Sequence, residues 1–131
     1  MSDNSRLKWL KRILVIKVAL IIFAWGLPVL LAPLSFFKLL GVPMPDDPLY
    51  MRLFGAVVMA FGVAYWYAFK DPVHNVAILK AAVVDNGLVT LTILVFIVFH
   101  DLRSVFMWIS ALLTFLLFLA FILLMPKTET A

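Results

Sequence analysis

The sequence predicts an all-α integral membrane protein, an up-down bundle of four membrane-spanning helices in one domain, residues 1–131. Apolar residues make up 66% of the chain, only 14% of its residues are charged, and its mean hydropathy is +1.13. A soluble domain has about 45–50% apolar and about 25% charged residues, so this chain has too little polar surface to cover a globule in water. Four spans of about 20 residues would use roughly 80 positions and leave the rest for ends and turns.

The first predicted span covers residues 13–31, which follow a basic segment at residues 6–12. A signal peptide has the same charge order, but its apolar region is about 7–15 residues long and ends at a small-residue cleavage site. This run is longer and has no Ala-x-Ala ending, so we expect a retained helix. Lys17 lies about one turn inside, where a lysine side chain can reach the headgroups. Pro28 should kink the outer end of the helix, because it removes a backbone donor.

A short helix at the membrane interface is predicted between the first two spans. Residues 35–41 are too few to cross a bilayer and too apolar for a free loop, and Gly41 can end a helix there. Three prolines within residues 42–48 keep the chain from continuing as helix. We expect the apolar side chains of this short helix to pack over the mouth of the bundle: Phe36, Phe37, Leu39 and Leu40.

Three further spans are predicted at residues 49–69, 73–99 and 102–125. An aspartate precedes each span and can cap its first turn: Asp47, Asp71 and Asp101. A proline follows Asp47 and Asp71 at the first helical position, where its missing N–H costs nothing. Pro126 should end the last span. Because the connections are short, consecutive helices should run antiparallel and pack as neighbours.

The basic residues outside the spans orient the predicted bundle. With both ends inside, the outer side receives two of them, Lys38 and Arg103, and the cytoplasmic side receives six. The six are Arg6, Lys8, Lys11, Arg12, Lys70 and Lys127. By the positive-inside rule this favours both termini in the cytoplasm. We therefore expect a multi-pass membrane protein.

The third span, residues 73–99, holds the most informative polar residues. An aspartate near the bilayer centre costs roughly 2.5–3.5 kcal/mol on insertion scales, so Asp85 should have a partner or a function. The helical rise places Arg52 and Asp85 at depths that differ by about 4 Å. We expect Arg52 to be the main partner of Asp85, with Asn86 and Thr90 completing the cluster, whereas Lys80 should point elsewhere. The cluster is either a structural polar lock between helices or a binding or proton-relay site.

The second span, residues 49–69, places Gly55 and Gly62 on one helical face. Small residues let a neighbouring backbone approach closely where membrane helices meet. This face is therefore either a packing face or the floor of a substrate groove.

Several function classes are excluded by what the sequence lacks. It has no cysteine, which excludes disulfides and thiolate metal sites. His74 and His100 lie at opposite ends of one predicted helix, which argues against a paired-histidine haem site. Asp85 is the only acidic residue within the spans and no catalytic motif is present, so we expect no enzyme activity, no metal and no cofactor. The basic segment fits anchoring at an anionic leaflet, and no nucleic-acid-binding motif accompanies it.

Two segments carry a resemblance to a known family. Residues 41–55 read Gly-Val-Pro-Met-Pro-Asp-Asp-Pro-Leu-Tyr-Met-Arg-Leu-Phe-Gly, and residues 64–72 read Ala-Tyr-Trp-Tyr-Ala-Phe-Lys-Asp-Pro. This run of hydropathy and turn residues resembles the small bacterial four-span proteins of the DoxX-like kind. The resemblance implies a four-helix inner-membrane protein, of a kind sometimes tied to respiratory or redox complexes, and it assigns no functional residue.

The sequence favours a non-enzymatic accessory or assembly subunit of a membrane complex, because turns, caps and charged anchors use almost every residue outside the spans. Its expected partners are the lipid bilayer and either other membrane subunits or further copies of the chain, and nucleic acid is not among them. The alternative is a small oligomeric transporter or ion-coupled carrier that uses Asp85 with Arg52 or Lys80. A membrane enzyme acting on lipid or quinone is disfavoured by the missing catalytic groups.

Overall fold

The computed structural model describes residues 2–126, and the part of the chain that it describes contains helices and no strands. The first span is one helical run in three parts: α1 (Asp3–Leu20), the π-helical segment η1 (Ile21–Gly26) and α2 (Leu27–Leu31). A short helix, α3 (Leu34–Leu39), follows it. The other three long helices are α4 (Leu49–Lys70), α5 (Val76–Phe99) and α6 (Val105–Leu124).

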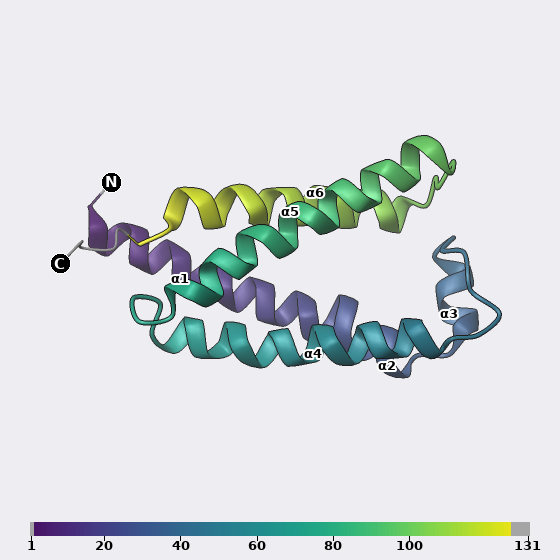
Figure 1. The fold of residues 1–131 in the computed structure, drawn as a ribbon, viewed down its shortest axis with the longest axis horizontal. Coiled ribbons are helices and arrows are strands. Elements are labelled where there is room, and N and C mark those ends of the chain that lie inside the picture. The colour runs from purple at the N-terminus through teal and green to yellow at the C-terminus, as the bar shows by residue number, and fades with distance from the viewer. Residues whose placement is uncertain (1, 127–131) are drawn as a thin grey trace.

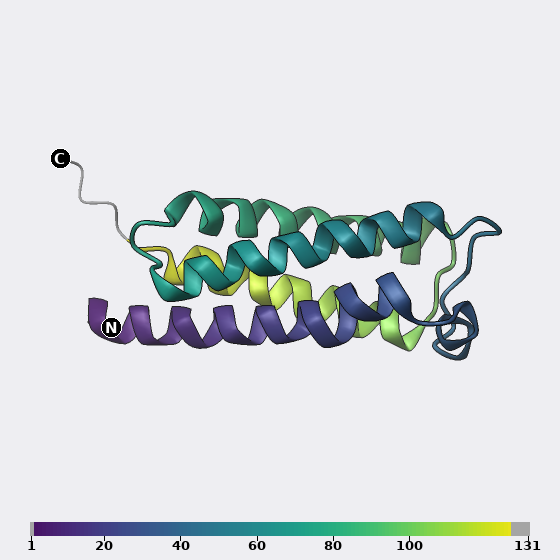
Figure 2. The same cartoon turned by 90° about the horizontal axis from the view of Figure 1, so that it is seen from below.

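The long helices form the predicted up-down four-helix bundle. The run from α1 to α2 packs against α4, α5 packs against α6, and α1 also packs against α6. The start of α1 and the turn between α4 and α5 lie at one end of the bundle, whereas α3 lies at the other (Figure 1). Figure 2 shows the same elements from below, with α1 and α4 on the near side. The all-α four-helix prediction is confirmed.

The bundle exposes many large apolar side chains and buries several polar ones within an otherwise apolar core. Phe23 is 78% exposed and Leu123 is 66% exposed, whereas Lys17 and Asn86 are 4% and 0% exposed. A soluble bundle exposes mainly polar groups, because water solvates polar groups and expels apolar ones. The run Asp3–Leu31 and the helices α4, α5 and α6 are each long and apolar enough to cross a membrane. The structure is therefore compatible with a small multi-pass membrane protein.

Helix α5 begins three residues later than the predicted span. Residues 72–75 form a turn, and the helix starts at Val76. Asp71 caps this turn instead of the helix, since its Oδ1 accepts a hydrogen bond from the His74 backbone N–H at 3.2 Å. Asp47 does cap the start of α4, as predicted, because its Oδ1 accepts a hydrogen bond from the Leu49 backbone N–H at 2.9 Å.

The prediction that Asp101 caps the fourth span is wrong. Helix α6 starts at Val105, and the residue before it, Ser104, holds the N-cap position. Asp101 has a φ of 53° and pairs with Arg103, so the chain turns there before the helix begins. The Ser104 hydroxyl donates to the Leu40 carbonyl at the end of α3, which ties α3 to the start of α6.

Helix α3 ends as the sequence predicts. Gly41 has a φ of 68°, a conformation that costs glycine little because it has no Cβ. Its backbone N–H donates to the Lys38 carbonyl and that of Val42 donates to the Phe37 carbonyl, the two bonds of a Schellman C-cap. Of the four apolar residues expected to pack, only Phe37 is buried, while Leu39 is 86% exposed. Placement of α3 at a membrane interface stays a prediction.

The distortion expected at Pro28 takes a π-helical form. A proline inside a helix lacks an N–H and its ring collides with the carbonyl four residues back. Here η1 directly precedes the residues around Pro28, and the chain returns to α-helix at Leu27. Gly26 ends η1 against α4, where an added Cβ would lie 2.5 Å from the Met59 sulfur. The distortion therefore occurs where α2 and α4 pack closely.

Candidate functional site

The strongest candidate site is a polar cluster inside the bundle, centred on an ion pair between Lys17 and Asp85. The Lys17 ammonium lies 3.2 Å from Asp85 Oδ2 and donates to Asn86 Oδ1 at 2.8 Å. Helix α1 packs against α4 and α6, so the long lysine side chain crosses the interior to reach α5. We define the buried polar cluster as Lys17, Trp25, Tyr65, Asp85, Asn86, Thr90, Ser110 and Thr114.

Two aromatic rings also surround the Lys17 ammonium. The ring centroids of Trp25 and Tyr65 each lie 5.4 Å from its Nζ, within the range of cation–π attraction. Trp25 belongs to η1, and its indole N–H donates to the Ser110 hydroxyl on α6 at 3.3 Å. The π-helical segment therefore supplies the residue that links the ion pair to α6. π-Helical turns inside α-helices occur frequently at functional sites.

Tyr65 connects α4 to the ion pair. Its side chain is fully buried, and its hydroxyl donates to Asp85 Oδ2 at 3.1 Å. Its ring stacks with those of Phe61 and Phe121, at centroid distances of 6.2 and 6.4 Å. The tyrosine ring is thus held by aromatic packing while its hydroxyl meets the carboxylate.

A row of hydroxyl and amide groups joins α5 to α6 beyond the ion pair. Asn86 Nδ2 donates to the Ala82 carbonyl at 2.6 Å, and Thr90 Oγ1 lies 2.8 Å from the Asn86 carbonyl. The Thr90 and Thr114 hydroxyls lie 2.8 Å apart, and Thr114 Oγ1 lies 2.9 Å from the Ser110 carbonyl. Each hydroxyl has one proton, so one donates across to the other helix and the other donates back along its own.

Asp85 has one carboxylate oxygen that the cluster does not use. Both hydrogen bonds to this residue end on Oδ2, and Oδ1 has no partner among the described residues. The side chain is 29% exposed, and no buried side-chain nitrogen or oxygen in the described part of the chain lacks a partner. Oδ1 therefore lies at the outer side of the bundle, where a donor from outside the chain can reach it.

The structure does not pair Arg52 with Asp85. The Arg52 guanidinium donates to the Val29 carbonyl at 2.8 Å and to the Ala32 carbonyl at 2.6 Å. These carbonyls belong to the end of α2, where a helix leaves acceptors unsatisfied and its dipole favours a cation. Arg52 is therefore a C-terminal cap for α2, and Lys17 takes the place predicted for it.

The depth argument failed because α5 starts late. In a helix that began at Pro72, Asp85 would lie about 20 Å from the inner boundary, whereas it lies nine residues after Val76, about 14 Å into the helix. This shift brings Asp85 to the level of Lys17, which is buried in the cluster and does not extend toward headgroups. Lys80 lies outside the cluster with an exposed side chain.

The two predicted packing glycines lie in close helix contacts. A Cβ on Gly55 would lie 2.7 Å from the backbone nitrogen of Leu30 in α2, and one on Gly62 would lie 2.9 Å from the Ile21 side chain in η1. Both glycines are buried. They therefore lie where α4 approaches the distorted part of the first span, and neither lines a polar groove.

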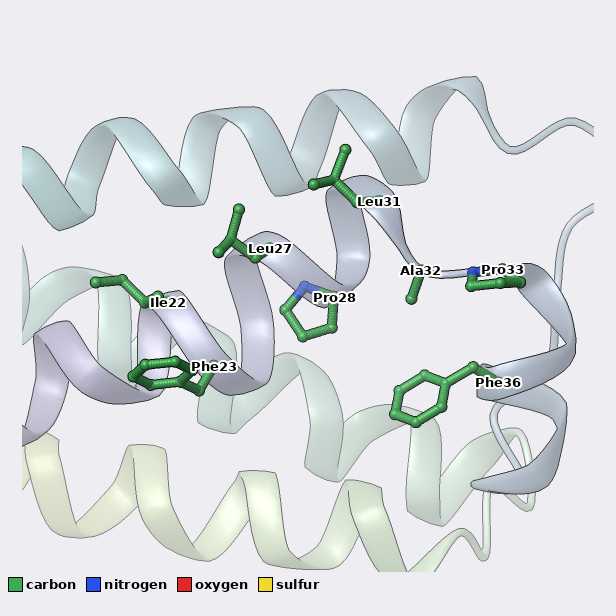
Figure 3. A pocket seen from close by; sticks show the side chains of 8 residues that line it. All are labelled: Ile22, Phe23, Leu27, Pro28, Leu31, Ala32, Pro33 and Phe36. Atoms are coloured by element: carbon green, nitrogen blue, oxygen red, sulfur yellow. The ribbon is translucent and has the colours of Figure 1, made fainter.

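A separate groove of ≈ 420 Å³ lies on the outer face of the first span. Figure 3 shows its lining residues, with the rings of Phe23 and Phe36 on either side of Pro28. The full lining is Ile22, Phe23, Leu27, Pro28, Leu31, Ala32, Pro33 and Phe36. No charged or hydrogen-bonding side chain lines it, so it offers only apolar contact.

Sequence reasoning brought Asp85, Asn86 and Thr90 together and missed the residues that the other helices contribute. Two signals could have found them. Lys17 is the only charged residue in the first apolar run, and Ser110 and Thr114, four residues apart, share one face of a helix. Among the described residues, no three His, Asp or Glu side chains gather as metal ligands would. Neither the comparison with protein-family models nor the searches of curated proteins and of solved structures find a match to this chain.

Proposed function

We propose that this chain is an accessory or assembly subunit of a complex in the bacterial cytoplasmic membrane, without catalytic activity of its own. One observation carries the proposal. Apart from Asp85 Oδ1, the polar side chains of the buried polar cluster bond within the chain, and they join α1, η1, α4, α5 and α6. Because the interior polar groups hold the helices together, we assign the protein's function to its outer surface.

That outer surface suits contact with lipid or with helices of other subunits. Large apolar side chains are exposed along all four spans, for example Phe54 on α4, Leu88 on α5 and Leu116 on α6. Lipid tails are as apolar as these side chains, so partner choice in a membrane depends on shape and on small or polar residues. The resemblance to DoxX-like proteins also supports an accessory role beside a respiratory or redox complex.

The orientation belongs to the same proposal. Among the described residues, five basic residues outside the spans fall at the end where α1 begins and two at the other, so the positive-inside rule favours both termini in the cytoplasm.

Purification of the tagged chain in mild detergent, with quantitative mass spectrometry, tests the accessory role. We expect the same membrane proteins to co-purify at a fixed ratio to the chain, and to do so from cells expressing it at native level. A Lys80→Gln variant should retain the partners, because Lys80 lies outside the buried polar cluster. Elution of the chain alone, with no partner at fixed ratio, would contradict the proposal.

An ion-coupled carrier is the second candidate, and the unused Asp85 Oδ1 favours it. A carboxylate that is 29% exposed and paired with a lysine can exchange that partner for a proton or a cation. If the chain is a carrier, reconstituted protein should support a proton or cation flux that Asp85→Asn abolishes while thermal stability in detergent stays unchanged. Loss of stability without any flux in the parent protein would exclude this role.

A further inference from the structure

The end of the bundle where α1 begins carries an unbalanced charge. Five basic side chains lie there among the described residues, against the carboxylates of Asp3 and Asp71. The five are Arg6, Lys8, Lys11, Arg12 and Lys70. None of them forms an ion pair within residues 2–126, and Asp71 turns toward His74, with Oδ2 2.7 Å from Nδ1.

Two of these lysines flank an aromatic pair on α4. The rings of Trp66 and Phe69 lie 5.2 Å apart. Lys11, on α1, places its ammonium 5.9 Å from the Phe69 centroid, and Lys70 places its own 5.9 Å from that of Trp66. We define Lys11, Lys70, Trp66 and Phe69 as the lysine–aromatic patch. It joins α1 to α4, which pack against each other.

We infer that the lysine–aromatic patch binds the phosphodiester headgroup of an anionic phospholipid. Cation–π contact positions each ammonium and leaves its three N–H donors free for phosphate oxygens. The Trp66 indole, with an apolar face and a polar N–H, offers an amphipathic surface on which the glycerol region of a lipid rests at an interface. Basic sites between membrane helices recognise acidic headgroups in this way.

The inference rests on the membrane location of the chain and not on its role as a subunit. Its chemistry distinguishes an anionic from a zwitterionic headgroup, because a choline group adds a cation beside two lysines whereas a glycerol group does not. Phosphatidylglycerol is therefore the expected ligand class and phosphatidylcholine the matched comparison.

Quenching of tryptophan fluorescence by brominated lipids tests the inference on purified full-length protein in nanodiscs. Brominated phosphatidylglycerol diluted into phosphatidylcholine should quench more strongly than the same amount of brominated phosphatidylcholine. Each basic residue near an anionic surface contributes about a fivefold factor in affinity, so Lys11→Gln with Lys70→Gln should weaken the preference about 25-fold. The double Lys→Arg variant should retain it and shows that the altered chain still folds.

The matched control removes the same charge at the same end, away from the patch. Arg6→Gln with Lys8→Gln should reduce the preference for phosphatidylglycerol much less than the Lys11 and Lys70 double variant. An equal loss in both variants would overturn the site and leave only diffuse attraction. Displacement of the lipid by millimolar inorganic phosphate would also overturn it, and absence of quenching by either lipid would instead refute the membrane location.

Discussion

The Lys17 ammonium and the Asp85 carboxylate lie 3.2 Å apart and connect α1 to α5 through the interior of the bundle. Asn86 on α5 also accepts from Lys17, and the Tyr65 ring on α4 lies 5.4 Å from the ammonium, so one lysine meets groups from two other helices. A charge inside a membrane bundle is costly unless it is paired, and here the partner comes from the far side of the interior. The arrangement makes the relative position of α1 and α5 depend on two side chains.

Arg52→Gln should destabilise the bundle independently of Asp85. The change removes charged donors from the Val29 and Ala32 carbonyls, and hydrogen bonds to charged groups contribute about 1.5–3 kcal/mol. Because Arg52 and Asp85 share no partner, the effects of Arg52→Gln and Asp85→Asn should add within about 0.5 kcal/mol. Thermal unfolding of the two single variants and the double variant in detergent measures this, and partial rescue in the double variant would show that Arg52 and Asp85 do interact.

Gly55→Ala should destabilise the protein more than Gly87→Ala. The new methyl on Gly55 would lie 2.7 Å from a backbone nitrogen in α2, which moves only if the helix moves. At Gly87 the nearest atoms belong to the Phe118 ring, 3.1 Å away, and a side chain adjusts more easily. Overpacking of this kind costs about 1–3 kcal/mol, and we expect Gly55→Ala at the upper end. Equal melting temperatures for the two variants would contradict the close contact of α2 and α4.

The turn between α4 and α5 should loosen in acid. The His74 backbone N–H holds the pKa of Asp71 below its usual value, and the His74 side chain adds to the effect. A lowered pKa in the folded state stabilises the turn above the unfolded pKa of about 3.9, and that stability is lost as pH falls through the folded pKa. At the amides of residues 73–75, the protection against hydrogen exchange relative to the intrinsic rates should therefore fall below about pH 4. Asp71→Ala should remove this dependence, and persistence of the dependence in Asp71→Ala would assign it to another group.

Reporter fusions test the proposed orientation. A reporter active only in the cytoplasm should work at both termini, because six basic residues outside the spans favour that side. Arg6→Gln with Lys8→Gln should weaken the bias, whereas Lys38→Gln should not. Activity of a periplasm-dependent reporter fused after Ala131 would contradict the orientation.

The fold could be predicted from the sequence because apolar run length and turn residues report directly on helices. The partner of Asp85 could not, because pairing depends on depth, and the four-residue turn at residues 72–75 moved Asp85 by about a turn of helix. A proline after an aspartate is compatible with a helix start or with a turn before one, and local sequence does not choose between them. The role of Trp25 could not be predicted either, because Trp25 lies in η1 and the sequence did not predict a π-helical segment.

The most direct test of the buried polar cluster as a structural lock is a double-mutant cycle on Lys17 and Asp85. Breaking a buried ion pair costs about 3–5 kcal/mol, and Asp85 is partly exposed, so Lys17→Met and Asp85→Asn should each cost about 3 kcal/mol or somewhat less. The double variant should lose clearly less than the sum of the two, with a coupling of at least about 1 kcal/mol. As a control, Lys80→Met, which alters an exposed lysine on the helix that carries Asp85, should change stability by less than about 0.5 kcal/mol. Single variants as stable as the parent, with additive effects in the double, would contradict the account.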